Sequence, residues 1–144
     1  MTSEPIMWAT YCDDVRQEVG NKLSYLGVYG PNLIVQSFPT TLVKLCCVFS
    51  VRVPTSAAPR HVIFKLLRDD DVLFEADLST SDMKDPAIGT LADGTDRRIL
   101  TISSIAQLVG FSITQPCVLK ARAIVDGKEL RGGALELLAA DVKH

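Results

Sequence analysis

Residues 43–53 read VKLCCVFSVRV, and this stretch decides the fold. Every odd position from Val43 to Val53 is apolar, whereas the even positions include Lys44 and Arg52. An alternation with a period of two is typical of a β-strand with one face turned inward. The sequence therefore predicts a long strand here, bracketed by Pro39 and Pro54.

The same pattern continues on both sides of two turn signals. Residues 62–67 and 72–78 alternate around Asp69-Asp70-Asp71, which predicts a hairpin. Residues 119–125 also alternate, and they are followed by Asp126-Gly127 and a further strand pattern over 129–137. Asp-Gly between two alternating runs favours a tight hairpin turn, because both central residues need a positive φ.

Weaker patterns complete the prediction of an all-β chain. Strands are expected at 6–12, 23–29, 33–35 and 98–105, and single helical turns at 15–22 and 105–110. The segment 79–96 reads as irregular. Many short strands separated by turns indicate one antiparallel β-sandwich of about seven to nine strands, immunoglobulin-like or C2-like, over residues 1–144.

The composition excludes several classes of protein. The chain has 144 residues, a formal net charge of -2 and 47% hydrophobic residues, which suits one domain with a real core. The near-neutral charge does not favour nucleic-acid binding. No secretory signal or membrane-length apolar run is present, and the four cysteines fit reduced, buried thiols. We therefore expect a cytoplasmic protein that binds neither nucleic acid nor membrane.

The N-terminal region carries a distinctive motif, C-D-D-x-R-x-E-x-G-x-K over residues 12–22, followed by Gly27-Val28-Tyr29 and Phe38-Pro39. With this motif the chain resembles an uncharacterised bacterial family of small proteins known only as a domain of unknown function. The resemblance would span most of the chain. It implies a β-sandwich from a bacterial or phage-like source, and it brings no catalytic residue with it.

An acidic end of the sandwich is a further expectation. If the strands run up and down, the segments 13–22, 54–59, 79–96 and 126–127 lie at one end and carry eight acidic against three basic residues. Loops on a rigid scaffold often bind ligands, and clustered carboxylates suit Ca²⁺. The candidate metal ligands are Asp13, Asp14, Asp93 and Asp96, although their spacing matches no EF-hand loop.

Five residues near the motif are the candidate ligand-binding group: Asp13, Asp14, Arg16, Glu18 and Lys22. Their charges can alternatively form ion pairs that only order their own segment, since carboxylates beside basic groups often serve local structure. We favour this structural interpretation over catalysis.

No catalytic constellation emerges, because the two histidines, His61 and His144, are isolated and no nucleophile motif is present. No cofactor is expected. Several apolar residues fall on the outward side of the strand pattern, which suggests a face covered by a protein partner or a second copy: Cys46, Val48, Ile63, Leu67, Leu73 and Ile124. The sequence thus favours a non-catalytic interaction module, which can also self-associate. The alternative is a Ca²⁺-dependent binder or an enzyme using the acidic end.

Overall fold

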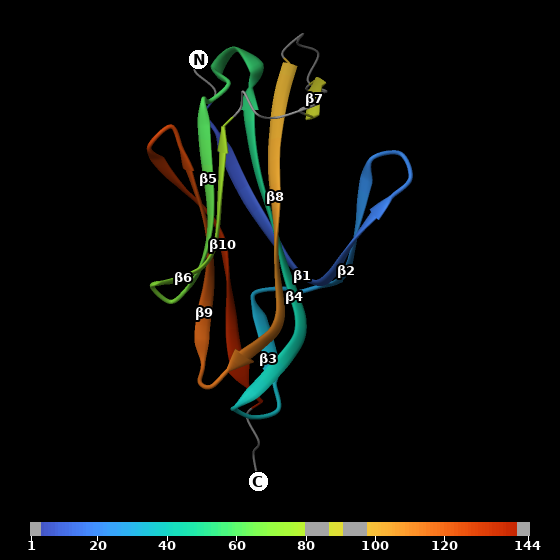
Figure 1. Cartoon of the computed structure of the whole chain (residues 1–144), viewed down its shortest axis with the longest axis vertical. Coiled ribbons are helices and arrows are strands. Elements are labelled where there is room, and N and C mark those ends of the chain that lie inside the picture. The colour runs from blue at the N-terminus through green and yellow to red at the C-terminus, as the bar shows by residue number, and fades with distance from the viewer. Residues whose placement is uncertain (1–3, 80–86, 91–97, 141–144) are drawn as a thin grey trace.

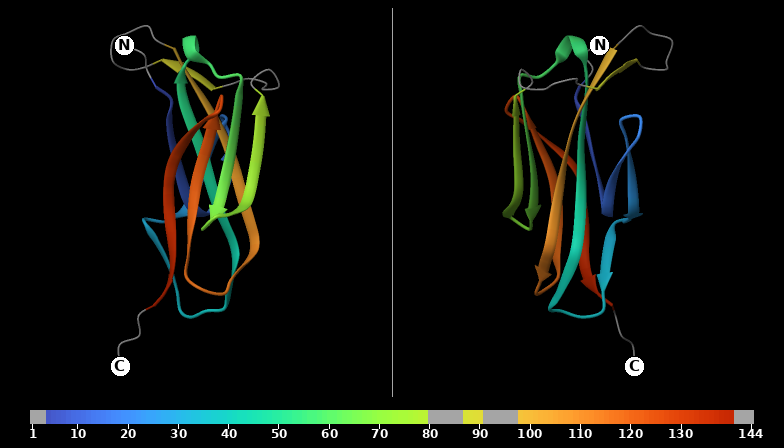
Figure 2. Two further views of the ribbon diagram at one scale, coloured as in Figure 1. Left: turned by 90° about the vertical axis from the view of Figure 1, so that its left-hand side faces the viewer. Right: turned by 45° about the vertical axis from the view of Figure 1, so that its right-hand side comes forward.

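The computed structural model describes residues 4–79, 87–90 and 98–140, and within them the chain forms two five-stranded sheets packed face to face (Figures 1 and 2). We call them sheet A, in the order β2-β1-β4-β8-β7, and sheet B, in the order β3-β10-β9-β5-β6. The predicted all-β sandwich is confirmed. One pair is parallel, β3 with β10, and the other pairs are antiparallel.

The strands of sheet A are β1 (Ile6–Glu18), β2 (Lys22–Val28), β4 (Thr40–Pro54), β7 (Ala87–Thr90) and β8 (Arg98–Ile113). Those of sheet B are β3 (Asn32–Val35), β5 (His61–Arg68), β6 (Asp71–Ser79), β9 (Cys117–Val125) and β10 (Lys128–Ala139). A short 3-10 helix, η1 (Thr55–Ala57), follows β4. No helix of the described residues is long and apolar enough to cross a bilayer.

Strand β4 lies at the centre of sheet A and supplies much of the core. From Leu45 to Val53 its odd residues are at most 1% exposed, as the alternation predicted. The pattern fails at Val43, which is 85% exposed, while Leu42 packs against the core instead. Val43 lies level with Gly110, which has a φ of 62°, between the pairs Leu42–Phe111 and Lys44–Val109.

Aromatic rings join the two sheets inside the sandwich. Phe49 of β4 stacks on Phe64 of β5, with 5.4 Å between ring centroids, and on Phe74 of β6 at 5.8 Å. Such stacked pairs stabilise a core beyond the area they bury. The inward positions of β4, β5 and β6 thus define how the sheets are stacked.

The hairpin turn predicted at Asp126-Gly127 is confirmed. Asp126 and Gly127 have φ values of 46° and 87°, and they join β9 to β10. The glycines of Arg131-Gly132-Gly133 coincide with a register shift in β10, which is typical of a β-bulge.

The two helical turns expected at 15–22 and 105–110 are wrong. Residues 105–110 continue β8, because they pair with β4 along their whole length. Short apolar runs fit strand and helix equally well, and here the neighbouring strand decides. Residues 15–18 continue β1 and turn back through Gly20 and Asn21, both at positive φ, into β2. The segment 79–96, expected to be irregular, contains strand β7.

Tyr11 ties sheet A to sheet B through a hydrogen bond. Its hydroxyl donates to the carbonyl of Gly133 at 3.0 Å, with Leu119 O at 3.4 Å, and the residue is 5% exposed. Burial also raises the pKa of this phenol far above its ordinary value. The hydroxyl therefore stays protonated and keeps donating between the sheets.

We expect Tyr11→Phe to lower the free energy of unfolding by about 1–2 kcal/mol, because buried carbonyls lose their donor. Chemical denaturation of purified protein measures this change. Tyr25→Phe is the matched control, since Tyr25 is 39% exposed, and it should stay within about 0.5 kcal/mol of the parent. Equal losses in the two variants would contradict the role given to Tyr11.

Candidate functional site

The five predicted ligand-binding residues lie on one element, the hairpin formed by the second half of β1 and by β2. Figure 1 shows this hairpin projecting sideways from sheet A. Strand β1 pairs with β4 from Ile6 to Cys12 and then with β2 from Cys12 to Glu18. We call residues 13–28 the arm. The structure thus brings Asp13, Asp14, Arg16, Glu18 and Lys22 together on the arm.

The expectation that Asp13 and Asp14 lie at an acidic end of the sandwich, beside Asp126, is wrong. Asp126 lies at the end of the sandwich, where its carboxylate accepts hydrogen bonds from the backbone N–H groups of Arg60 and His61 at 3.0–3.2 Å. Asp13 and Asp14 instead follow Cys12, which pairs with Cys46 near the middle of β4. The reason is that residues 13–18 form a strand rather than a loop.

Asp13 is fitted into the base of the arm. Its carboxylate accepts a hydrogen bond from the Tyr29 hydroxyl and packs against Gly27, which has a φ of 66°. A Cβ on Gly27 would stand 2.8 Å from the Asp13 Cγ. Burial and, next, the bond to Asp13 raise the pKa of Tyr29 to about 12. Asp13 therefore links the two strands of the arm to Tyr29, which packs against the core.

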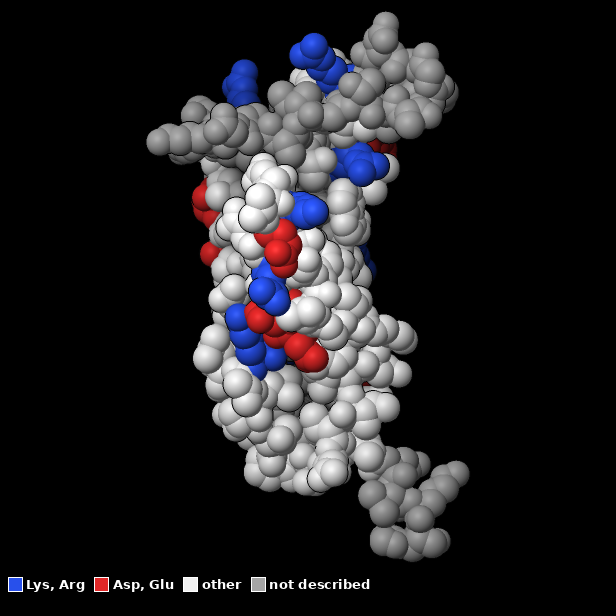
Figure 3. Space-filling view, turned by 90° about the vertical axis from the view of Figure 1, so that its right-hand side faces the viewer, with Lys and Arg blue, Asp and Glu red and all other residues white. Residues whose placement is uncertain are grey.

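Asp14 and Lys44 form a second link between arm and sandwich. The Lys44 ammonium lies 2.6 Å from the Asp14 carboxylate, which also accepts the Val15 N–H at 2.9 Å. The Lys44 hydrogen bond lowers the pKa of Asp14 below its ordinary value. Closer to the tip of the arm, the Arg16 Nε lies 3.9 Å from the Glu18 Oε1. Glu18 of β1 lies opposite Lys22 of β2 in the strand register. Figure 3 shows acidic and basic side chains intermixed in a cluster on one side of the molecule.

Only two of the four proposed calcium ligands, Asp13 and Asp14, lie within the described residues. Asp93 and Asp96 lie outside the described residues. In the part of the chain that is described, no group of three or more histidines, cysteines, aspartates or glutamates is placed to hold a metal ion. Calcium binding stays a prediction.

The thiols are buried, as expected. Cys12, Cys46, Cys47 and Cys117 are free and at most 6% exposed. Burial raises the pKa of Cys12 to about 11 and that of Cys47 further still. A thiol is nucleophilic as the thiolate, so these raised pKa values make each a poor nucleophile at neutral pH.

The apolar positions expected on the outer faces are largely covered by the chain itself. Cys46 and Val48 are 0% and 3% exposed, and the others are half-buried: Ile63, Leu67, Leu73 and Ile124. Leu73 packs against the core, because a register shift between Leu66 and Leu67 changes how β6 faces β5. Sequence alternation could not reveal that shift.

Exposed apolar side chains gather on the arm instead. Among the large hydrophobic residues, the arm exposes Val19 at 94%, Leu23 at 43%, Tyr25 at 39%, Leu26 at 45% and Val28 at 59%. Consecutive residues of a strand point to opposite sides, so Tyr25 and Leu26 place apolar groups on both faces of the arm. The sequence shows these residues, but it does not show that the second half of β1 leaves the sandwich.

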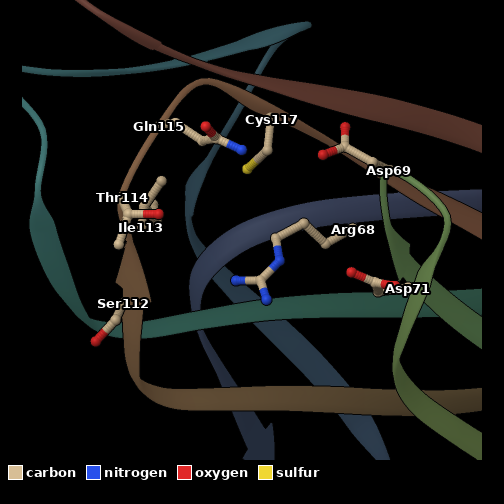
Figure 4. Close-up of a pocket in the computed structure, with 8 residues that line it drawn as sticks. All are labelled: Arg68, Asp69, Asp71, Ser112, Ile113, Thr114, Gln115 and Cys117. Atoms are coloured by element: carbon tan, nitrogen blue, oxygen red, sulfur yellow. The ribbon is translucent and has the colours of Figure 1, made fainter.

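A hollow of about 380 Å³ lies on the opposite side of the sandwich, between the β5–β6 turn and the end of β8 (Figure 4). The Arg68 guanidinium extends into it from β5, with Asp69 and Asp71 on the same side. Arg68 also lies 5.6 Å from the ring centroid of Phe111. This cation–π contact and the nearby carboxylates order Arg68 without defining a reactive site.

Comparison with known proteins places the chain in a family. The model of a family of unknown function, DUF6941, matches residues 7–137. The chain belongs to this family, and the resemblance to a domain of unknown function is confirmed. None of the curated proteins and none of the solved structures matches the chain.

Gly27→Ala should destabilise the protein by about 1–3 kcal/mol more than Gly20→Ala, measured by chemical denaturation. Both glycines have positive φ, 66° and 89°, so both substitutions carry a backbone cost, and φ alone does not make it larger at Gly27. At Gly20 an added Cβ meets no atom within 4 Å, whereas at Gly27 it meets Asp13. Equal effects of the two substitutions would mean that Asp13 does not need the space above Gly27.

The protein should lose stability at alkaline pH. The pKa of Cys12 is raised from 9.0 to about 11 and that of Tyr29 from 10.0 to about 12 in the folded state. The unfolded chain therefore releases these protons first, so the contribution is full below pH 9 and declines as pH rises toward 12. Denaturation midpoints between pH 8 and about 11.5 should fall steadily, and Tyr29→Phe should flatten the decline above about pH 10. A decline unchanged in Tyr29→Phe would contradict this assignment.

Proposed function

We propose that this chain is a non-catalytic protein-interaction module whose arm inserts into an apolar cleft of a partner protein. The observation that carries this proposal is the exposure of apolar side chains on both faces of the arm, from Val19 to Val28. A large exposed apolar area usually marks a binding surface. A two-faced arm needs a cleft rather than a flat surface to cover both sides.

The links at the base of the arm support this role. Asp13 with Tyr29 and Gly27, and Asp14 with Lys44, hold the arm before any partner binds. A pre-ordered element loses less conformational entropy on binding, so more of the contact energy contributes to affinity.

The charges on the arm indicate the chemistry of the partner. Arg16, Glu18 and Lys22 place both signs near the tip, and the ion pair and strand register set them beside one another. A mixed-charge rim around an apolar centre resembles a protein–protein interface. A nucleic acid or an anionic membrane would instead favour a surface of one basic sign.

Site-specific photo-crosslinking in cells tests the proposal. We place a benzophenone amino acid at Leu23 or at Leu26, on opposite faces of the arm, and expect both positions to link to the same partner. Val72, on β6 and 54% exposed, is the control position and should give no such product.

Leu26→Lys should remove the product formed from Leu23 and leave the unfolding free energy within about 0.5 kcal/mol, because Leu26 is exposed. Three results would overturn the proposal: no product from either position, the same product from Val72, or a product made of two copies of this chain.

A further inference from the structure

Among the residues that the structure describes, no strand lies beside one edge of sheet A over most of its length. Strand β8 pairs with β4 from Ile99 to Ile113 on one side. On its other side it pairs with β7 from Arg98 to Thr101. Within the described residues, β8 therefore presents unpaired backbone groups from Ile102 to Ile113, which we call the open edge.

Space is free next to the open edge. A hollow of about 510 Å³ runs along residues 107–112 and is bounded on the far side by Arg68 and Leu73 of sheet B. Val109 is 74% exposed at the middle of this stretch. The nearest edge strand of sheet B, β6, therefore does not cover β8 here.

The open edge lacks two features that usually prevent strands from pairing between molecules, namely charged residues and proline. Residues 99–113 read ILTISSIAQLVGFSI, with no charged residue and no proline. Three other edge strands described are protected by charge or by shortness: β6 contains Asp71, Glu75 and Asp77, and β3 and β7 have four residues each. Charges and short length are common protections of exposed edges.

We propose that the open edge pairs with the open edge of a second copy of this chain, antiparallel, about a two-fold axis near Gln107. A two-fold contact uses the same residues on both copies, so it suits a strand that is compatible with itself. The uncharged stretch brings no like charges together in any antiparallel register. Gln107 lies near the middle of the open edge, so this register pairs its whole length and joins two copies of sheet A into one continuous sheet.

The proposal is separate from the role of the arm. The arm lies at the β2 side of sheet A and the open edge at the β8 side, with β1 and β4 between them. Loss of one contact therefore leaves the other in place.

Disulfide trapping tests the two-fold contact. In Gln107→Cys, the two new thiols should lie near the axis, where facing strands have Cα atoms about 4.5–5.5 Å apart and a disulfide can form. Mild oxidation of the folded Gln107→Cys variant should give a covalent dimer on a non-reducing gel. The native cysteines are buried, so the parent protein should give none.

Val43→Cys is the matched control. Val43 is 85% exposed but lies on β4, one strand inward from the edge. In the proposed dimer the two Val43 residues are at least three strand spacings apart, more than about 14 Å, which is too far for a disulfide. Covalent dimer from Val43→Cys as abundant as from Gln107→Cys would overturn the proposal.

Sedimentation over a range of concentrations gives the second readout. The parent should be dimeric, and Gln107→Lys should raise the dissociation constant about two- to fivefold, because it places two lysines opposite one another at the axis. A parent that stays monomeric throughout, or a dimer that Gln107→Cys does not trap, would overturn the inference. Crosslinking from the arm is measured in different variants. Failure of the open edge to form a dimer would therefore not contradict the proposed function of the arm.

Discussion

The structure depends on the burial of one strand, β4, among β1, β8 and the facing sheet B. Its inward residues from Leu45 to Val53 are excluded from water, and Phe49 stacks on rings from β5 and β6. Burying a large apolar side chain contributes about 1.5–3 kcal/mol, so this row supplies a large share of the driving force for stacking the sheets. The length of β4 also allows β8 to extend well beyond its pairing with β7. The open edge is thus the part of β8 that pairs with the long core strand β4 but extends past the four-residue strand β7.

Local patterns in the sequence predicted the sandwich, the long strand and two hairpins, because each of these depends on residues close together in the chain. The features that sequence reasoning missed depend on distant residues. Residues 15–18 are a strand because β2 returns beside them, and residues 105–110 are a strand because β4 holds them. Likewise, the register shift at Leu66 turns Leu73 toward the core.

The candidate site shows the same division. The motif over residues 12–29 identified the residues that gather on the arm, but the charge count assigned them to the wrong place. Asp13 illustrates why: its neighbours in space are Gly27 and Tyr29, which reach it through the hairpin return. Alternation along a single strand says which side a residue faces, but it does not say where a strand leaves its sheet. Several acidic residues counted toward a binding end instead have local structural roles, such as Asp126 with the backbone of Arg60 and His61.

Strand β1 belongs to two structures at once, since its first half is a member of the sandwich and its second half is a side of the arm. No linker separates the two halves, so the orientation of the arm is coupled directly to sheet A. A hairpin joined through a flexible linker would adopt many orientations relative to the sandwich. The continuous backbone of β1 restricts the arm to a narrow range of orientations. The continuity of β1 therefore fixes the orientation of the arm relative to sheet A.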